Sequence, residues 1–132
     1  MKLLEKYQEE AAEDVKIDPV IIQDKQMMLP SIKHKWVARL IQSKYAIKRL
    51  DRDRKIAIDG IVEQLKTKSK VGLSDPSAIA AARKHHSIIK ISDDIEEMEL
   101  IVLYLEKVEK LFASMTWDYK NIVDLVKMET LG

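Results

Sequence analysis

The chain has 132 residues, no cysteine, 46% hydrophobic and 34% charged residues, and a formal net charge of +1. This length and hydrophobic content predict one folded domain over residues 1–132 and argue against disorder. The lack of cysteine excludes disulfides, thiol chemistry and Cys-based zinc sites, and it fits a reducing cytoplasm. Because only three Gly and three Pro are present, the composition favours long helices over sheets.

The N-terminal stretch, residues 1–17, is acidic and has apolar residues at helical spacing. We expect a short amphipathic helix here and not a signal peptide, since acids stand where such a peptide needs an apolar run. Asp18-Pro19 predicts the start of a second helix, because Asp is a good cap and Pro loses nothing at the first helical position. Pro30 is expected to kink or end that helix.

Residues 18–70 form the basic long-helix region. From Ile32 to Leu65 the apolar residues recur at steps of three or four, or at sums of such steps, which predicts a helix over about residues 31–67. At 1.5 Å per residue this helix would be roughly 55 Å long. Since a domain this small cannot cover such a helix on both sides, we expect part of it to pack against another subunit.

Residues 71–92 are predicted to form a loop and a short helix, with the loop itself beginning at about Lys66. Asp75-Pro76 repeats the cap-plus-Pro start of a helix that runs to about Lys84. The run 87–91 (SIIKI) is β-branched, so a short extended segment competes there with helix. Ser92-Asp93 then opens the last helix, with a capping-box pattern in its first turn.

The C-terminal region, residues 93–132, is apolar on more than one helical face. A helix of this kind is normally buried, and a chain of this size has few other helices to bury it, so we predict self-association. Thr116-Trp117 marks an expected bend between two C-terminal helices. The candidate oligomerisation residues are Met98, Val102, Leu105, Phe112, Met115, Trp117, Tyr119, Ile122 and Val126.

The charge is divided into three blocks: residues 1–24 carry −4, residues 25–70 carry +9, and residues 71–132 carry −4. We call residues 25–70 the basic block. A helix with this charge predicts a polyanion-binding surface, because Lys and Arg neutralise phosphates and release condensed counterions. The candidate binding residues are Lys44, Lys48, Arg49, Arg52, Arg54, Lys55, Lys66, Lys68 and Lys70.

Simpler interpretations compete with each of these candidates. The basic block also fits a solvated face with intrahelical pairs such as Asp51 with Lys55. Tyr45 and Trp36 are able to stack on bases, although Trp36 lies on the apolar stripe and better fits a core position. His85-His86 lacks the spacing of a metal site, because adjacent side chains diverge on a helix. No phosphate loop, Cys nucleophile or triad spacing is present, so we predict no enzyme, no cofactor and no metal.

Four segments, in order and at matching separations, resemble the phage recombination mediator family of UvsY. They are YQEEAAEDVKID at 7–18, HKW at 34–36, IIKISDDI at 88–95 and SMTWDYKNIVDL at 114–125. The resemblance covers nearly the whole chain. It implies an all-α protein with a long kinked helix and a C-terminal oligomerisation helix, assembled into a ring.

The resemblance also implies the ligand and the partners. Members of this family bind single-stranded DNA and help a RecA-like recombinase replace the single-strand-binding protein during recombination, replication and repair. A basic pair that serves DNA binding in the family aligns here with Asp59 and Ile61, so those roles do not carry over to this chain. A rival hypothesis is a helical oligomeric scaffold whose basic face binds an acidic protein partner.

Overall fold

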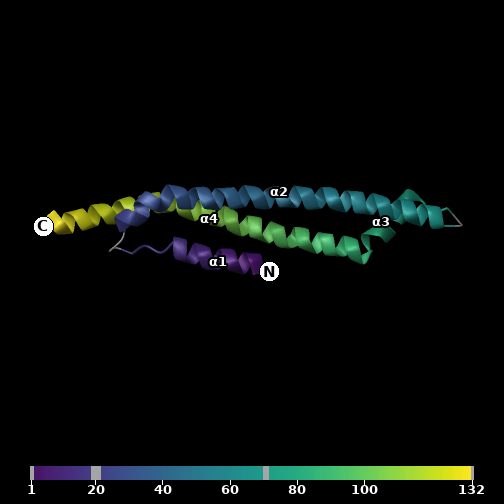
Figure 1. Cartoon of the computed structure of the whole chain (residues 1–132), viewed down its shortest axis with the longest axis horizontal. Coiled ribbons are helices and arrows are strands. Elements are labelled where there is room, and N and C mark those ends of the chain that lie inside the picture. The colour runs from purple at the N-terminus through teal and green to yellow at the C-terminus, as the bar shows by residue number, and fades with distance from the viewer. Residues whose placement is uncertain (1, 19–21, 70–71, 132) are drawn as a thin grey trace. The chain divides into compact units, whose positions relative to one another are not determined.

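The computed structural model describes residues 2–18, 22–69 and 72–131. The described residues contain no strand and form four helices, α1 (Lys2–Asp14), α2 (Ile22–Lys68), α3 (Asp75–Arg83) and α4 (His86–Leu131) (Figure 1). The all-α prediction is therefore confirmed. The expected helix start at Pro19 and the candidate binding residue Lys70 lie outside the described residues.

The prediction of an extended segment at 87–91 is wrong, and so is the predicted helix start at Ser92. α4 already begins at His86, and the backbone N–H groups of Ile88 and Ile89 both donate to the carbonyl of His85 at 3.0 Å. Ile88 is only 2% exposed. Burying this side chain outweighs the modest β preference of isoleucine, which depends strongly on context.

α2 and α4 are both longer than predicted. α2 continues through Pro30 and ends at Lys68, although a proline in a helix interior removes one hydrogen bond and costs about 3 kcal/mol. Leu29 and Ile32, on either side of Pro30, are both buried, so tertiary packing holds the helix together there. α4 likewise runs through Thr116-Trp117, and the two expected C-terminal helices are one.

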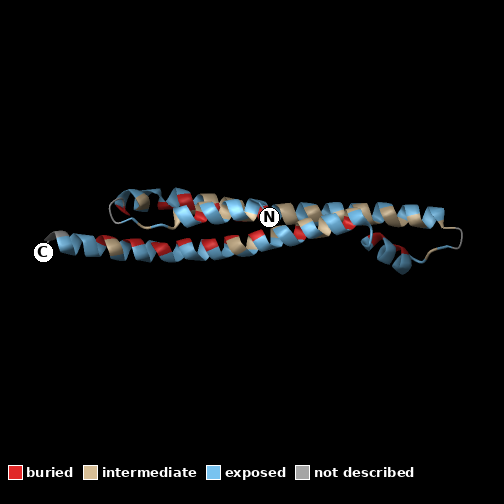
Figure 2. Ribbon diagram, turned by 90° about the horizontal axis from the view of Figure 1, so that it is seen from below, coloured by how far each residue is buried: buried red, intermediate tan, exposed pale blue. Residues whose placement is uncertain are grey.

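The chain divides into two compact units. The first unit consists of the residues up to Gln42 together with those from Leu100 onward, and the second unit is Ser43–Glu99. The single domain proposed for residues 1–132 stays a prediction. Each unit has its own buried side chains, which recur along the helices in Figure 2.

The core of the first unit is centred on Trp36 of α2, which is 1% exposed. Its ring stacks on Phe112 of α4 at 6.4 Å between centroids and meets the edge of Tyr7 of α1 at 5.8 Å. Its indole Nε1 donates a hydrogen bond of 2.9 Å to Asp14 at the end of α1. One side chain therefore joins three helices, which confirms the interpretation of Trp36 as core.

Ion pairs between α1 and α2 surround this core. Arg39 donates to Glu10 at 2.6 Å and Lys35 donates to Asp14 at 2.6 Å. The hydrogen bond from Arg39 holds the pKa of Glu10 below its ordinary value of 4.5. Arg39 also lies over both the Tyr7 and Trp36 rings, 4.9 and 4.8 Å from their centroids, a geometry in which a cation is attracted to the ring face.

The second unit has smaller buried side chains. α3 fully buries Ala78 and Ala82, and α4 buries Ile88 and Ile95. The Ser74 side chain caps α3 by accepting from the Ser77 N–H at 3.4 Å. The cap therefore lies one residue before the predicted Asp75, which is the first residue of the helix. The apolar positions of α2 in this unit, such as Leu50 and Ile58, are only half-buried. The charged side of α2 in this unit, which carries Lys48, Arg52 and Lys55, is exposed to solvent.

Trp36 and the exposed Met27 provide a test of the first unit with its own control. Trp36→Ala is expected to lower the free energy of unfolding by about 3–5 kcal/mol, because it removes a buried ring that contacts α1 and α4. Met27→Ala, at a side chain that is 82% exposed, should change it by about 0.5 kcal/mol or less. Urea denaturation followed by circular dichroism measures both, and equal effects would contradict the assignment of Trp36 as the core.

Candidate nucleic-acid interface

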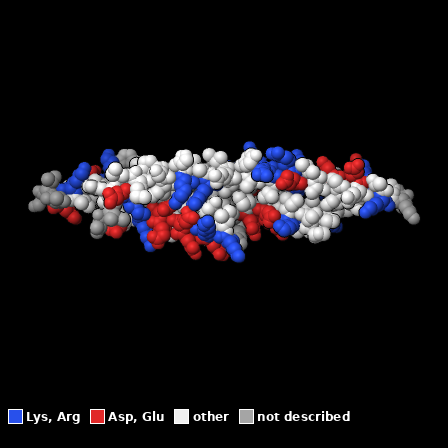
Figure 3. All heavy atoms as spheres, in the orientation of Figure 1, with Lys and Arg blue, Asp and Glu red and all other residues white. Residues whose placement is uncertain are grey.

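Lys44, Lys48, Arg52 and Lys55 are all exposed on the part of α2 that lies in the second unit. Steps of four, four and three residues place them on one side of the helix, and we call these four residues the basic face. Figure 3 shows Lys and Arg gathered over this part of α2. The structure therefore places these four of the predicted cations on one surface.

Three members of the basic face have no ion pair among the described residues. No carboxylate oxygen of the described chain lies within 4.0 Å of the charged nitrogens of Lys48, Arg52 or Lys55. In particular, the intrahelical pair of Asp51 with Lys55 does not form. Asp51 instead accepts from Arg54 at 3.0 Å. The interpretation of the face as a set of intrahelical salt bridges does not hold for these residues.

Arg54 differs from its neighbours because its guanidinium is held in place. It donates to Asp51 at 3.0 Å and to the Ser92 hydroxyl of α4 at 3.1 Å, and its side chain is 35% exposed. These two partners hold the planar guanidinium in one orientation, whereas a solvated lysine ammonium has no fixed orientation.

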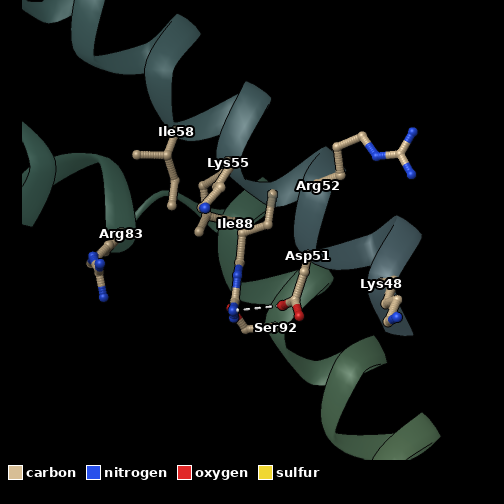
Figure 4. A pocket seen from close by; sticks show the side chains of 9 residues that line it. Lys48, Asp51, Arg52, Lys55, Ile58, Arg83, Ile88 and Ser92 are labelled. Atoms are coloured by element: carbon tan, nitrogen blue, oxygen red, sulfur yellow. Dashed lines mark hydrogen bonds and ion pairs between the residues drawn. The ribbon is translucent and has the colours of Figure 1, made fainter. Parts of the chain in front are cut away.

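These residues line an open pocket of about 710 Å³ in the second unit (Figure 4). α3 contributes Arg83 to it, and α4 contributes Ile88 and Ser92. Arg83 is not among the binding residues predicted from the sequence, because nothing in its spacing connects it with α2. Only the tertiary structure brings it to the basic face. The full lining is Lys48, Asp51, Arg52, Arg54, Lys55, Ile58, Arg83, Ile88 and Ser92.

Of the two aromatic residues considered for base stacking, the structure leaves only Tyr45 accessible. Tyr45 is 57% exposed, whereas Trp36 is buried. The Arg49 guanidinium lies 6.0 Å from the centroid of the Tyr45 ring. Proteins that bind single strands likewise combine positive charge, which neutralises phosphates, with exposed aromatic rings on which bases stack.

The remaining predicted cations are distributed less favourably. Lys66 forms an ion pair with Asp75, Lys68 is exposed, and Lys70 lies outside the described residues. In the earlier part of the basic block, Lys33 donates to the Thr116 hydroxyl and Lys25 to the Glu13 carbonyl. Contacts inside the first unit therefore engage much of the early positive charge.

The candidate oligomerisation residues fall into two groups. Leu105, Phe112, Met115 and Tyr119 are buried inside the first unit, so their burial requires no second subunit. Met98, Val102 and Ile122 are half-buried, whereas Trp117 and Val126 are exposed. Other exposed large apolar side chains of α4, absent from the predicted set, are Ile89, Leu100, Leu103, Leu111, Leu125 and Met128.

Other kinds of site find little support in the described part of the chain. It contains no group of three or more His, Cys, Asp and Glu side chains able to hold a metal ion. His85 and His86 stack on each other at 4.4 Å between ring centroids, which is a ring contact and not a ligand arrangement. None of the described helices has the length and apolarity needed to span a membrane.

Comparison with known proteins identifies the fold. No protein-family model and no curated protein sequence matches the chain. The crystal structure of the bacteriophage T4 recombination mediator protein UvsY superposes on it with a TM-score of 0.79, covering 95% of this chain and 97% of that chain at 17% sequence identity. The resemblance seen in the sequence is thus confirmed for the fold: this chain has the fold of the recombination mediator UvsY.

Proposed function

We propose that this protein is a recombination mediator. It binds single-stranded DNA and promotes the loading of a RecA-like recombinase in place of the single-strand-binding protein, during homologous recombination and recombination-dependent replication and repair. The observation that carries this proposal is the exposed basic face of α2 on a chain with the fold of UvsY. The function requires binding and no catalytic step, and its setting is the cytoplasm of the host cell.

The basic face supplies the affinity in this proposal. Among the described residues, no carboxylate pairs with Lys48, Arg52 or Lys55. A DNA phosphate therefore pairs with these cations without first displacing an ion pair. Each phosphate that they neutralise releases condensed counterions from the strand. Tyr45 adds a ring on which an unpaired base stacks, and this contact favours single strands over duplex.

Self-association repeats the basic face and so increases the affinity for a long strand. The exposed Leu103, Trp117 and Leu125 of α4 are large apolar side chains that a second copy would cover. In a ring the basic face recurs once per subunit, so a long strand that binds one subunit meets the next at high effective concentration. A wrapped strand would lose contacts with the resident single-strand-binding protein and be presented to the recombinase.

The acidic α1 provides a surface for protein partners. Glu10 and Asp14 are engaged with α2, whereas Glu5 and Glu9 are exposed. Figure 3 shows acidic side chains gathered over α1. We assign this acidic surface to contact with the recombinase or the single-strand-binding protein, because both of these DNA-binding proteins need positive charge of their own.

Binding to oligothymidylate should depend strongly on salt. Each neutralised phosphate of a single strand contributes about −0.7 to the slope of log K against log salt concentration. Reversing three charges with Lys48→Glu, Arg52→Glu and Lys55→Glu should reduce that slope by about 2 and leave assembly intact. The measurement is fluorescence anisotropy over a salt series.

A matched control reverses three exposed lysines elsewhere, with Lys2→Glu, Lys110→Glu and Lys127→Glu. The change in net charge is the same, so equal losses from the two triple variants would contradict a localised interface. Failure of the wild-type protein to bind the strand, together with tight binding of an acidic polypeptide, would favour the rival scaffold.

Tyr45→Ala is expected to weaken binding to oligothymidylate by about 1–3 kcal/mol, the range for one base stacked on an aromatic ring. Tyr45→Phe keeps the ring and should bind like the wild type. Because the ring is uncharged, the salt slope should stay constant in both variants. An affinity for Tyr45→Ala equal to that for Tyr45→Phe would remove stacking from the proposal.

The combined substitutions Trp117→Asp and Leu125→Asp should reduce the mass of the assembly, since each places a charge on the apolar surface of α4 that is proposed to be covered. Long strands should then bind more weakly through lost avidity. Met27→Asp with Ile56→Asp, at two exposed apolar positions of α2, is the control and should leave the mass unchanged. Light scattering measures the mass, and an unaltered mass for the α4 variant would contradict this role.

A further inference from the structure

The pocket in Figure 4 combines charge from two helices that are separate in the sequence. Lys48, Arg52, Arg54 and Lys55 come from α2 and Arg83 from α3, and Asp51 is the one carboxylate in the lining. Asp51 already accepts a hydrogen bond from Arg54, so its negative charge is paired within the pocket lining. The lining retains a net positive charge, which selects an anionic ligand.

The apolar lining residues and the volume of the pocket limit the chemical class and size of the anion. Two isoleucines also line the pocket, Ile88 buried and Ile58 half-buried. The cations therefore share the lining with apolar side chains. A volume of about 710 Å³ lies within the range of about 300–1,000 Å³ for sites that enclose small molecules, and it accommodates a phosphate with its attached sugar.

Part of this wall is rigid before any ligand arrives. The hydroxyl of Ser92 and the carboxylate of Asp51 fix Arg54. Figure 4 shows Arg83 of α3 and Arg52 of α2 on opposite sides of the pocket, with Lys55 between them. Two helices that are separate in the sequence therefore supply the cations of one pocket.

We propose that this pocket binds an internal phosphodiester group of the nucleic-acid strand and that Arg83 is one of its phosphate-binding residues. The strand then contacts α3 as well as α2, and Arg83 supplies the planar guanidinium fork that matches two phosphate oxygens. Ser92 acts as a positioning residue through Arg54. This inference rests on the proposed function and adds to it a binding residue outside the basic block.

The residue next to Arg83 provides a matched control. Lys84 follows Arg83 directly and is likewise exposed, but it does not line the pocket. Diffuse attraction to positive charge predicts equal losses from Arg83→Gln and Lys84→Gln. A pocket predicts that only Arg83→Gln weakens binding, by about tenfold, and reduces the salt slope by about 0.7, the contribution of one phosphate.

The experiment uses the full chain and oligothymidylate without a terminal phosphate, in anisotropy titrations over a salt series. Arg83→Lys keeps the charge without the fork, so it should retain the salt slope and recover part of the affinity. Arg83 is exposed, and the thermal midpoints of all variants should match that of the wild type. Ser92→Ala should weaken binding without changing the number of charges.

The outcomes separate the two proposals. Wild-type protein that does not bind the strand at low salt overturns the proposed function itself. Wild-type binding with equal slopes and affinities for Arg83→Gln and Lys84→Gln overturns the pocket and leaves the basic face standing. If the two variants differ only on an oligonucleotide with a 5′-phosphate, the pocket takes a chain end, and the assignment to an internal phosphodiester is wrong.

Discussion

The packing of the Trp36 indole is the contact on which the first unit depends. The ring lies between Tyr7 of α1 and Phe112 of α4, and its N–H is satisfied by Asp14. A buried ring of this size contributes several kcal/mol, which is large beside the usual stability of a small protein. Without it, α1 would lose the ring contact of Tyr7 and the hydrogen bond of Asp14 that join it to α2.

The same contact decides where the positive charge of α2 is available. With α1 held against Trp36, Glu10 and Asp14 lie beside Arg39 and Lys35 and pair with them. In the second unit, no carboxylate oxygen of the described residues lies within 4.0 Å of the charged nitrogens of Lys48, Arg52 or Lys55. Their charge is therefore available to a ligand. α2 thus contributes core and ion-pair residues in its first part and the proposed binding surface in its second.

α4 shows that a helix with more than one apolar face can serve two purposes. Leu105, Phe112 and Tyr119 are buried within one chain, so the apolar character of α4 is not by itself evidence for a second subunit. Only the apolar side chains that remain exposed, such as Leu103 and Leu125, indicate a second subunit. Isolated exposed apolar residues are ordinary in soluble proteins, but a series of them along one helix is a reason to expect a partner.

Local pattern alone was sufficient for much of the fold. The periodicity from Ile32 onward predicted α2, the Asp75-Pro76 step predicted the start of α3, and the acidic N-terminal stretch predicted α1. The pattern failed where packing competes with propensity. Ile88 is helical because it is buried, and α2 passes through Pro30 because the neighbouring Leu29 and Ile32 are buried.

The sequence by itself determined the helical class and the location of the cations, because both follow from the order of residues along the chain. It also limited base stacking to two aromatic candidates. Only the tertiary structure decided that Trp36 is core and Tyr45 is exposed, and that Arg83 joins the α2 cations. The physical reason is that exposure, ion pairing and pocket lining are relations between helices, and spacing within one helix carries no information about them.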